Sequence, residues 1–245
     1  LTDAVNLHRR DYNVAPQILP NGNEGITAFS GVFQPTVNLP FLNCVNIDST
    51  NYQVNNNFSQ YYNHYHCANF SIYSEKNNLM NTVFFGGIAQ YFDVNGVLTQ
   101  NNDVPFVKTI ARVERDKIGK MAEYKFPNEM PTYLGAGSEF IPVESISKYE
   151  NGVINYDDIN SDSILIGYIY GGIKSSDLNI FFINDGTQSS ANSQIFKVYF
   201  KKTKSTDIHE LNPQSTGTLK INVFPNPGEE DFNIKFNLIK ETDVK

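Results

Sequence analysis

The chain of 245 residues carries a formal net charge of −7, and only 18% of its residues are charged. This balance argues against nucleic acid or an anionic membrane as the main partner, because phosphates attract clustered Lys and Arg side chains. A membrane-spanning helix needs about 18 consecutive apolar residues. The sequence contains no apolar run of that length, so it predicts no such helix. The chain opens at Leu1 without a charged-then-apolar signal, and we expect a processed mature protein or a piece of a longer one.

Short alternating or fully apolar runs dominate the chain, and helical spacing is scarce, which predicts an all-β fold. We expect three units of about four strands each, over about 1–60, 61–130 and 131–204. The expected strands, in chain order, are 8–16, 26–33, 41–47, 52–54, 65–73, 81–88, 106–115, 120–126, 138–143, 164–173, 178–183 and 194–200. A turn is expected at 75–78, and 106–115 with 120–126 is expected to form a hairpin about 116–119.

Each unit contains an apolar strand that ends at glycine. These glycines are Gly31, the pair Gly86-Gly87 and the pair Gly171-Gly172. A residue without Cβ permits close backbone approach where strands crowd together.

Four-stranded units that repeat at intervals of about 50 residues are typical of kelch-type β-propeller blades. At the glycine pairs the sequence resembles the kelch family, which implies blades around a central channel. The usual downstream Tyr and Trp of a kelch blade are not cleanly present, and Phe181-Phe182 and Tyr91-Phe92 are candidates for those aromatic positions. The alternative is a β-sandwich in which the glycines only mark strand ends. Propellers have about four to eight blades, so we expect further blades elsewhere in the protein or on another chain.

The composition changes after residue 204. Residues 205–218 are predicted to form a polar linker, and 219–228 and 231–238 two strands around a Pro-Asn-Pro-Gly turn. The segment Val223-Phe224-Pro225-Asn226-Pro227 resembles the start of the C-terminal sorting domain of the type IX secretion system of Bacteroidota. The resemblance implies a small β-sandwich-like domain over 219–245, the secretion machinery as partner, and a secreted or outer-membrane surface location. The alternative is a chance Pro-flanked turn in an ordinary β-module.

Candidate metal ligands are few. His64 and His66 alternate and could converge on one face of a strand, but zinc takes three or four ligands and no second pair stands out. Residues 93–96 and 184–186 could offer oxygen ligands to calcium, although Asx-Gly sequences more often form tight turns. We therefore expect no metal and no cofactor. Cys44 and Cys67 could form one disulfide or be two separate buried thiols.

Acid/base candidates for glycoside cleavage are Asp157 and Asp158 with Asp162, and Glu139 with Glu144. Solvated loop acids are the more ordinary interpretation, and we assign no catalytic residue. The sequence favours a non-catalytic protein that binds a glycan, a peptide or a surface protein through exposed Tyr and Asn side chains. A polysaccharide-degrading propeller enzyme, and a structural subunit or cargo of an extracellular or secretion assembly, are the alternatives.

Overall fold

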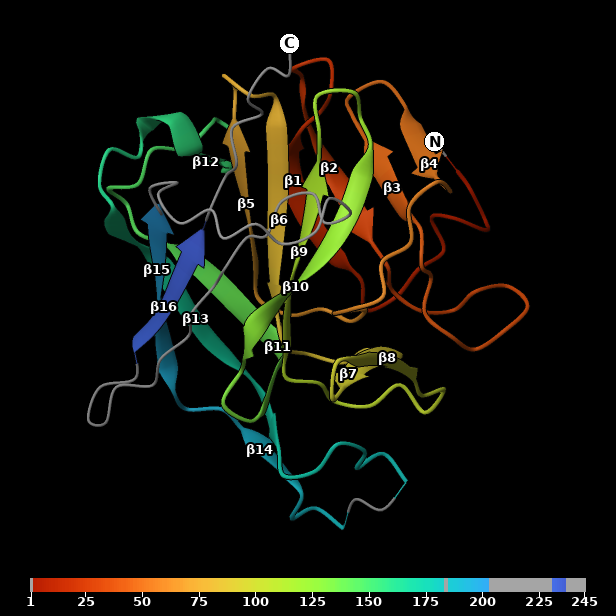
Figure 1. The fold of residues 1–245 in the computed structure, drawn as a ribbon. Coiled ribbons are helices and arrows are strands. Elements are labelled where there is room, and N and C mark those ends of the chain that lie inside the picture. Colours follow the sequence, from red (N-terminus) through yellow and green to blue (C-terminus); the bar gives the residue numbers. More distant parts are fainter. Residues whose placement is uncertain (1, 183–184, 203–230, 237–245) are drawn as a thin grey trace.

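The computed structural model describes residues 2–182, 185–202 and 231–236 of an all-β protein (Figure 1). Its strands are β1 (Asn13–Ile18), β2 (Glu24–Phe29), β3 (Cys44–Ile47), β4 (Tyr52–Asn55), β5 (Asn69–Ser74), β6 (Leu79–Phe85), β7 (Tyr91–Val94), β8 (Val97–Gln100), β9 (Thr109–Arg115), β10 (Met121–Glu129), β11 (Tyr133–Pro142), β12 (Ile154–Asn155), β13 (Ser163–Ser175), β14 (Ser189–Ala191), β15 (Ile195–Lys202) and β16 (Asp231–Phe236). One short 3₁₀ helix, η1, covers Tyr156–Asp158. Within these described ranges no helix is long and apolar enough to cross a membrane.

Three sheets are built mainly from antiparallel strands. The first has the order β1-β2-β3-β4, the second is built on β5-β6-β9-β10, and the third on β11-β13-β15. The β7–β8 hairpin is a separate two-stranded sheet between β6 and β9 in the chain. None of the three sheets is closed on itself, and Figure 1 shows the second lying between the first and the third.

Two strands join these sheets out of sequence. β12 pairs in parallel with β5, so a strand within the expected third unit extends the second sheet. β16 pairs in parallel with β15 at the edge of the third sheet. The described part of the predicted strand 231–238 is therefore a strand, and its partner is β15. The expected linker, the motif Val223-Phe224-Pro225-Asn226-Pro227 and the strand 219–228 lie outside the described residues.

The core is divided between the two sheet interfaces. Phe84 of β6 packs with Phe29 of the first sheet, their ring centroids 5.2 Å apart. Its neighbour Phe85 belongs to the larger cluster with Leu134 and Phe196 of the third sheet. Successive side chains of a strand point to opposite faces, so a strand buried on both faces has a continuous apolar sequence. This double burial explains the unbroken run that ends β6.

Local predictions have mixed outcomes. The turn at 75–78 and the β9–β10 hairpin are confirmed, and Asp116 Oδ1 accepts the amide of Lys120 across the hairpin turn at 2.9 Å. The strand expected at 178–183 is wrong over its described part, 178–182. Ser175 Oγ donates to Asp177 O, and Asn179 Oδ1 accepts the amide of Phe181, so local side-chain bonds replace a ladder there.

The four residues expected at the aromatic positions of a kelch blade do not lie in the three main sheets. Phe181 and Phe182 are 52% and 76% exposed, and Phe181 stacks on Phe106. Tyr91 and Phe92 lie in β7, in the separate hairpin.

Candidate functional site

All five predicted glycines have left-handed backbone, with φ between +61° and +86°. A Cβ at Gly86 would lie closer than 3.0 Å to the carbonyl oxygen of Leu134, and one at Gly172 would lie 2.7 Å from the carbonyl oxygen of Ala136. Gly171 differs, because a Cβ there would meet nothing within 4 Å. Close backbone approach therefore accounts for Gly86 and Gly172, and the positive φ alone accounts for Gly171.

Two of these glycines connect neighbouring sheets. The amide of Gly31, just past β2, donates to His64 O at 3.0 Å, and the amide of Gly87 donates to Leu134 O at 2.9 Å. Gly135 completes the second junction, since a Cβ there would lie within 3.0 Å of the carbonyl oxygen of Phe85. Sequence reasoning missed Gly135, although a glycine inside a strand pattern is a signal for a bulge, and the β11–β13 register does shift beside it.

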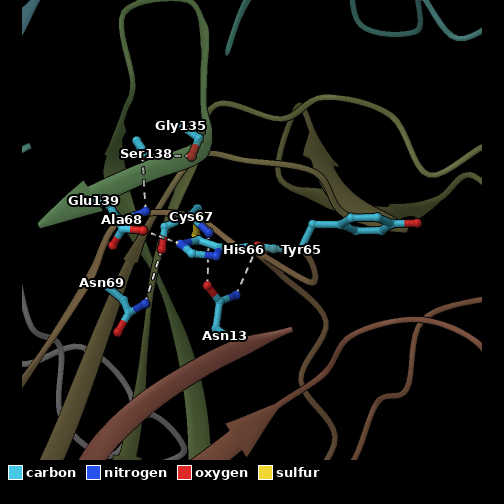
Figure 2. A network of polar contacts seen from close by, with 9 residues as sticks. All are labelled: Asn13, Tyr65, His66, Cys67, Ala68, Asn69, Gly135, Ser138 and Glu139. Atoms are coloured by element: carbon cyan, nitrogen blue, oxygen red, sulfur yellow. Dashed lines mark hydrogen bonds and ion pairs between the residues drawn. The ribbon is translucent and has the colours of Figure 1, made fainter. Parts of the chain in front are cut away.

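The segment that leads into β5 is held between the first and third sheets (Figure 2). Asn13 of β1 is 1% exposed, donates to Tyr65 O at 3.0 Å and accepts the amide of Cys67 at 2.9 Å. From the other side, Ser138 Oγ of β11 accepts the amide of Ala68 at 3.1 Å. Side chains of two sheets thus satisfy the backbone of an irregular segment, which fixes its position.

His64 and His66, which could have converged on one strand face, do not do so. Asn63 has φ +53°, so the segment is not extended and the strand alternation does not apply. His64 is fully buried: Nδ1 accepts the amide of Gln90 at 3.0 Å, and Nε2 therefore carries the proton and donates to Gln60 O at 2.9 Å. Burial lowers the pKa of His64 to about 4.

His66 instead faces solvent, with 47% of its side chain exposed, and its Nε2 lies 3.0 Å from Glu139 Oε1 (Figure 2). In the part of the chain that the structure describes, no three His, Cys, Asp or Glu side chains are grouped as a metal site would require.

The candidate acids have structural partners. Asp157 accepts Ser74 Oγ at 3.0 Å and the amide of Lys76 at 3.1 Å, which caps the turn between β5 and β6. Asp158 accepts Ser147 Oγ at 2.6 Å.

The calcium candidate at 93–96 is the tight turn of the β7–β8 hairpin. Asp93 Oδ1 accepts the amide of Gly96 at 2.7 Å, and Asn95 and Gly96 both have positive φ, as a hairpin turn of this length requires. Lys125 Nζ lies 3.5 Å from the same carboxyl oxygen of Asp93. In the second candidate, Asp185 accepts the amide of Thr187, and residue 184 lies outside the described ranges.

Cys44 and Cys67 are free and buried, so the disulfide alternative is wrong for this structure. Burial raises the pKa of each thiol to about 12, which leaves both without thiolate character at neutral pH.

A surface hollow of about 410 Å³ lies where the loop between β4 and β5 meets β8 and the start of β10. The hollow is open to solvent and does not enclose a ligand as a typical small-molecule cavity does. Its lining includes Phe58, Tyr61, Tyr62, Leu98 and Glu123. Phe58 is buried beneath it, whereas Tyr61 and Leu98 remain 37% and 44% exposed.

Glu123 supplies the carboxyl group of this hollow. Its Oε2 accepts the amide of Tyr61 at 2.6 Å, and its Oε1 accepts the amide of Tyr62 at 3.2 Å. The residue is half-buried, and desolvation raises the pKa of Glu123 to about 8, against the two amides, which lower it. Burial, with the nearby charge of Glu123, raises the pKa of Tyr62 to about 12.

Sequence reasoning did not find this hollow, because its two sides are about sixty positions apart and only the pair Tyr61-Tyr62 was visible locally. Comparisons with protein-family models, with curated proteins and with solved structures find no match to the chain.

Proposed function

We propose that the three sheets are successive blades of a kelch-like β-propeller that acts as an extracellular binding protein. Two features support this arrangement. The first sheet is a four-stranded meander, and the other two are each built on antiparallel strands, β5-β6-β9-β10 and β11-β13-β15. Glycine amides also connect β2 to the segment that leads into β5, and the end of β6 to β11. The outward side of the third sheet also exposes Ile141, Tyr170 and Ile195, a surface that a neighbouring blade would cover. The proposal requires further blades, because three do not close a propeller.

The proposed location is the cell surface or the medium, reached through the type IX secretion system. The motif at 223–227 carries this part of the proposal, and its test is export of the full protein from a host with that system. Pro225→Ala with Asn226→Ala should retain the protein inside the cell. Equal export of the variant, or export from a host without the system, would contradict it.

The proposed role is non-catalytic binding of a glycan, peptide or surface protein. The observation that carries it is the open aromatic hollow with a single carboxylate, Glu123, among its described lining residues. Glycoside hydrolysis usually needs two carboxylates, and Asp157 and Asp158 are occupied as turn and loop partners. The test is screening of the protein on glycan and peptide arrays together with a product assay. We expect retention of a ligand without turnover, and release of product would contradict the role.

One observation favours the polysaccharide-degrading alternative. A carboxyl group whose pKa burial raises to about 8 could act as a general acid at neutral pH. An enzyme of this kind should lose hydrolysis in Glu123→Gln and keep it in Asp157→Asn, and absence of hydrolysis in the wild-type protein excludes it.

A further inference from the structure

We infer that the hollow at Glu123 is a subsite for one uncharged pyranose unit of a polysaccharide. This inference rests on the proposed binding function and specifies its ligand. A pyranose has an apolar C–H face and hydroxyl groups at its edge, so its recognition needs a flat apolar surface and a fixed polar group beside it. Tyr61 and Glu123 supply these two elements.

Tyr61 provides the flat surface. Its ring packs edge-to-face on Tyr91 of β7, with centroids 5.1 Å apart and an interplanar angle of 83°. The residue nevertheless remains 37% exposed, on a hollow whose floor includes the buried Phe58. An aromatic ring that is already packed in place loses little conformational freedom when a ligand covers it.

Glu123 provides the fixed polar group. Both of its carboxyl oxygens accept backbone amides, one of them the amide of Tyr61 itself. A hydrogen bond therefore connects Glu123 directly to the residue that carries the stacking ring, Tyr61. Each carboxyl oxygen can accept a further hydrogen bond from a sugar hydroxyl.

The charges around the hollow favour an uncharged ligand. None of its described lining residues is a cation, so a uronate or sulfated sugar would find no opposite charge there. Nearby Lys125 is tied to Asp93 at 3.5 Å and Glu129 at 3.6 Å. A cationic ligand is also disfavoured, because burial raises the pKa of Glu123 and so reduces its negative charge near pH 7.

The test is calorimetric titration of the purified chain with cellohexaose, laminarihexaose, maltohexaose, mannohexaose and chitohexaose. Hexagalacturonate serves as the anionic probe and hexalysine as the cationic one. We expect at least one neutral sugar to bind and both charged probes to fail. Tyr61→Ala should weaken that binding about tenfold or more, Tyr61→Phe should keep most of it, and Glu123→Gln should weaken it less than Tyr61→Ala.

Phe182→Ala is the control, since Phe182 is an aromatic residue that is 76% exposed and does not line the hollow, so its loss should leave the affinity unchanged. Neutral-sugar binding that survives Tyr61→Ala would overturn the subsite but not the proposed binding function. Binding of hexalysine or hexagalacturonate at the hollow, or no binding of any neutral sugar, would overturn the inference. The proposed function itself fails if the glycan and peptide arrays are also negative, or if the product assay detects turnover. Tyr61 is exposed, so its variants test the subsite even if Glu123→Gln does not fold.

Discussion

Replacing Gly86 by alanine tests whether close backbone contact at the glycines holds the sheets together. Gly86 has φ +61°, which costs a residue with a side chain about 1–2 kcal/mol. The new Cβ would also lie within 3.0 Å of the carbonyl oxygen of Leu134, which is a backbone atom and cannot rotate away. β11 must therefore shift away from β6.

That shift removes the hydrogen bond that crosses the junction, in which the amide of Gly87 donates to Leu134 O at 2.9 Å. The amide of Gly86 donates to Thr109 O within the second sheet, so that bond is kept. A hydrogen bond contributes about 1 kcal/mol, and the backbone cost is about 1 kcal/mol after the lower entropy of the unfolded alanine chain is included, so we expect Gly86→Ala to lose about 2 kcal/mol of unfolding free energy.

Gly171→Ala is the matched control for the backbone conformation. Gly171 has φ +75° but open space around its Cβ position, so only the backbone cost applies, about 1 kcal/mol after the lower entropy of the unfolded alanine chain is included. Urea unfolding followed by circular dichroism measures both variants. Equal losses of stability would refute the reasoning, because they would show that the contact with Leu134 contributes nothing.

Three further predictions concern buried or capped groups. Because burial lowers the pKa of His64 to about 4, the unfolding free energy should fall as the pH is lowered from about 6.5 to 4, by up to about 3 kcal/mol. Urea midpoints measured against pH should show this slope, and His64→Gln should remove it. Cys44 and Cys67 should resist a thiol reagent until the chain unfolds, and immediate labelling in native buffer would contradict their burial. Asp157→Asn should cost about 1 kcal/mol in thermal unfolding and leave sugar binding unchanged, whereas a loss of polysaccharide hydrolysis in this variant would contradict the structural role of its carboxylate.

The predictable part of the fold depends on local patterns. The run that ends at Phe85 was predictable as a strand because double burial requires continuous apolar side chains, and the glycines after it because crowding and positive φ both exclude Cβ. The strand expected at 178–183 is absent over 178–182, because apolar residues alone do not show whether a partner strand is present. Local hydrogen bonds involving the side chains of Ser175 and Asn179 end the regular structure there.

Candidate site residues were harder to predict because their environments depend on distant segments. His64 and His66 are close in sequence, yet one is enclosed by Gln60 and Gln90 while the other faces Glu139. The hollow is the extreme case: Glu123 gains its position only from amides about sixty residues earlier in the chain. The spacing of apolar residues along the chain does not indicate contacts between such distant segments.

The most direct measurement of the binding account is a crystal structure of the protein with the neutral hexasaccharide that binds best. We expect one sugar ring stacked on Tyr61, with a hydroxyl oxygen about 2.7–2.8 Å from a Glu123 carboxyl oxygen and the glycosidic bonds intact. A ligand bound elsewhere on the sheets, or a cleaved sugar at Glu123, would contradict it.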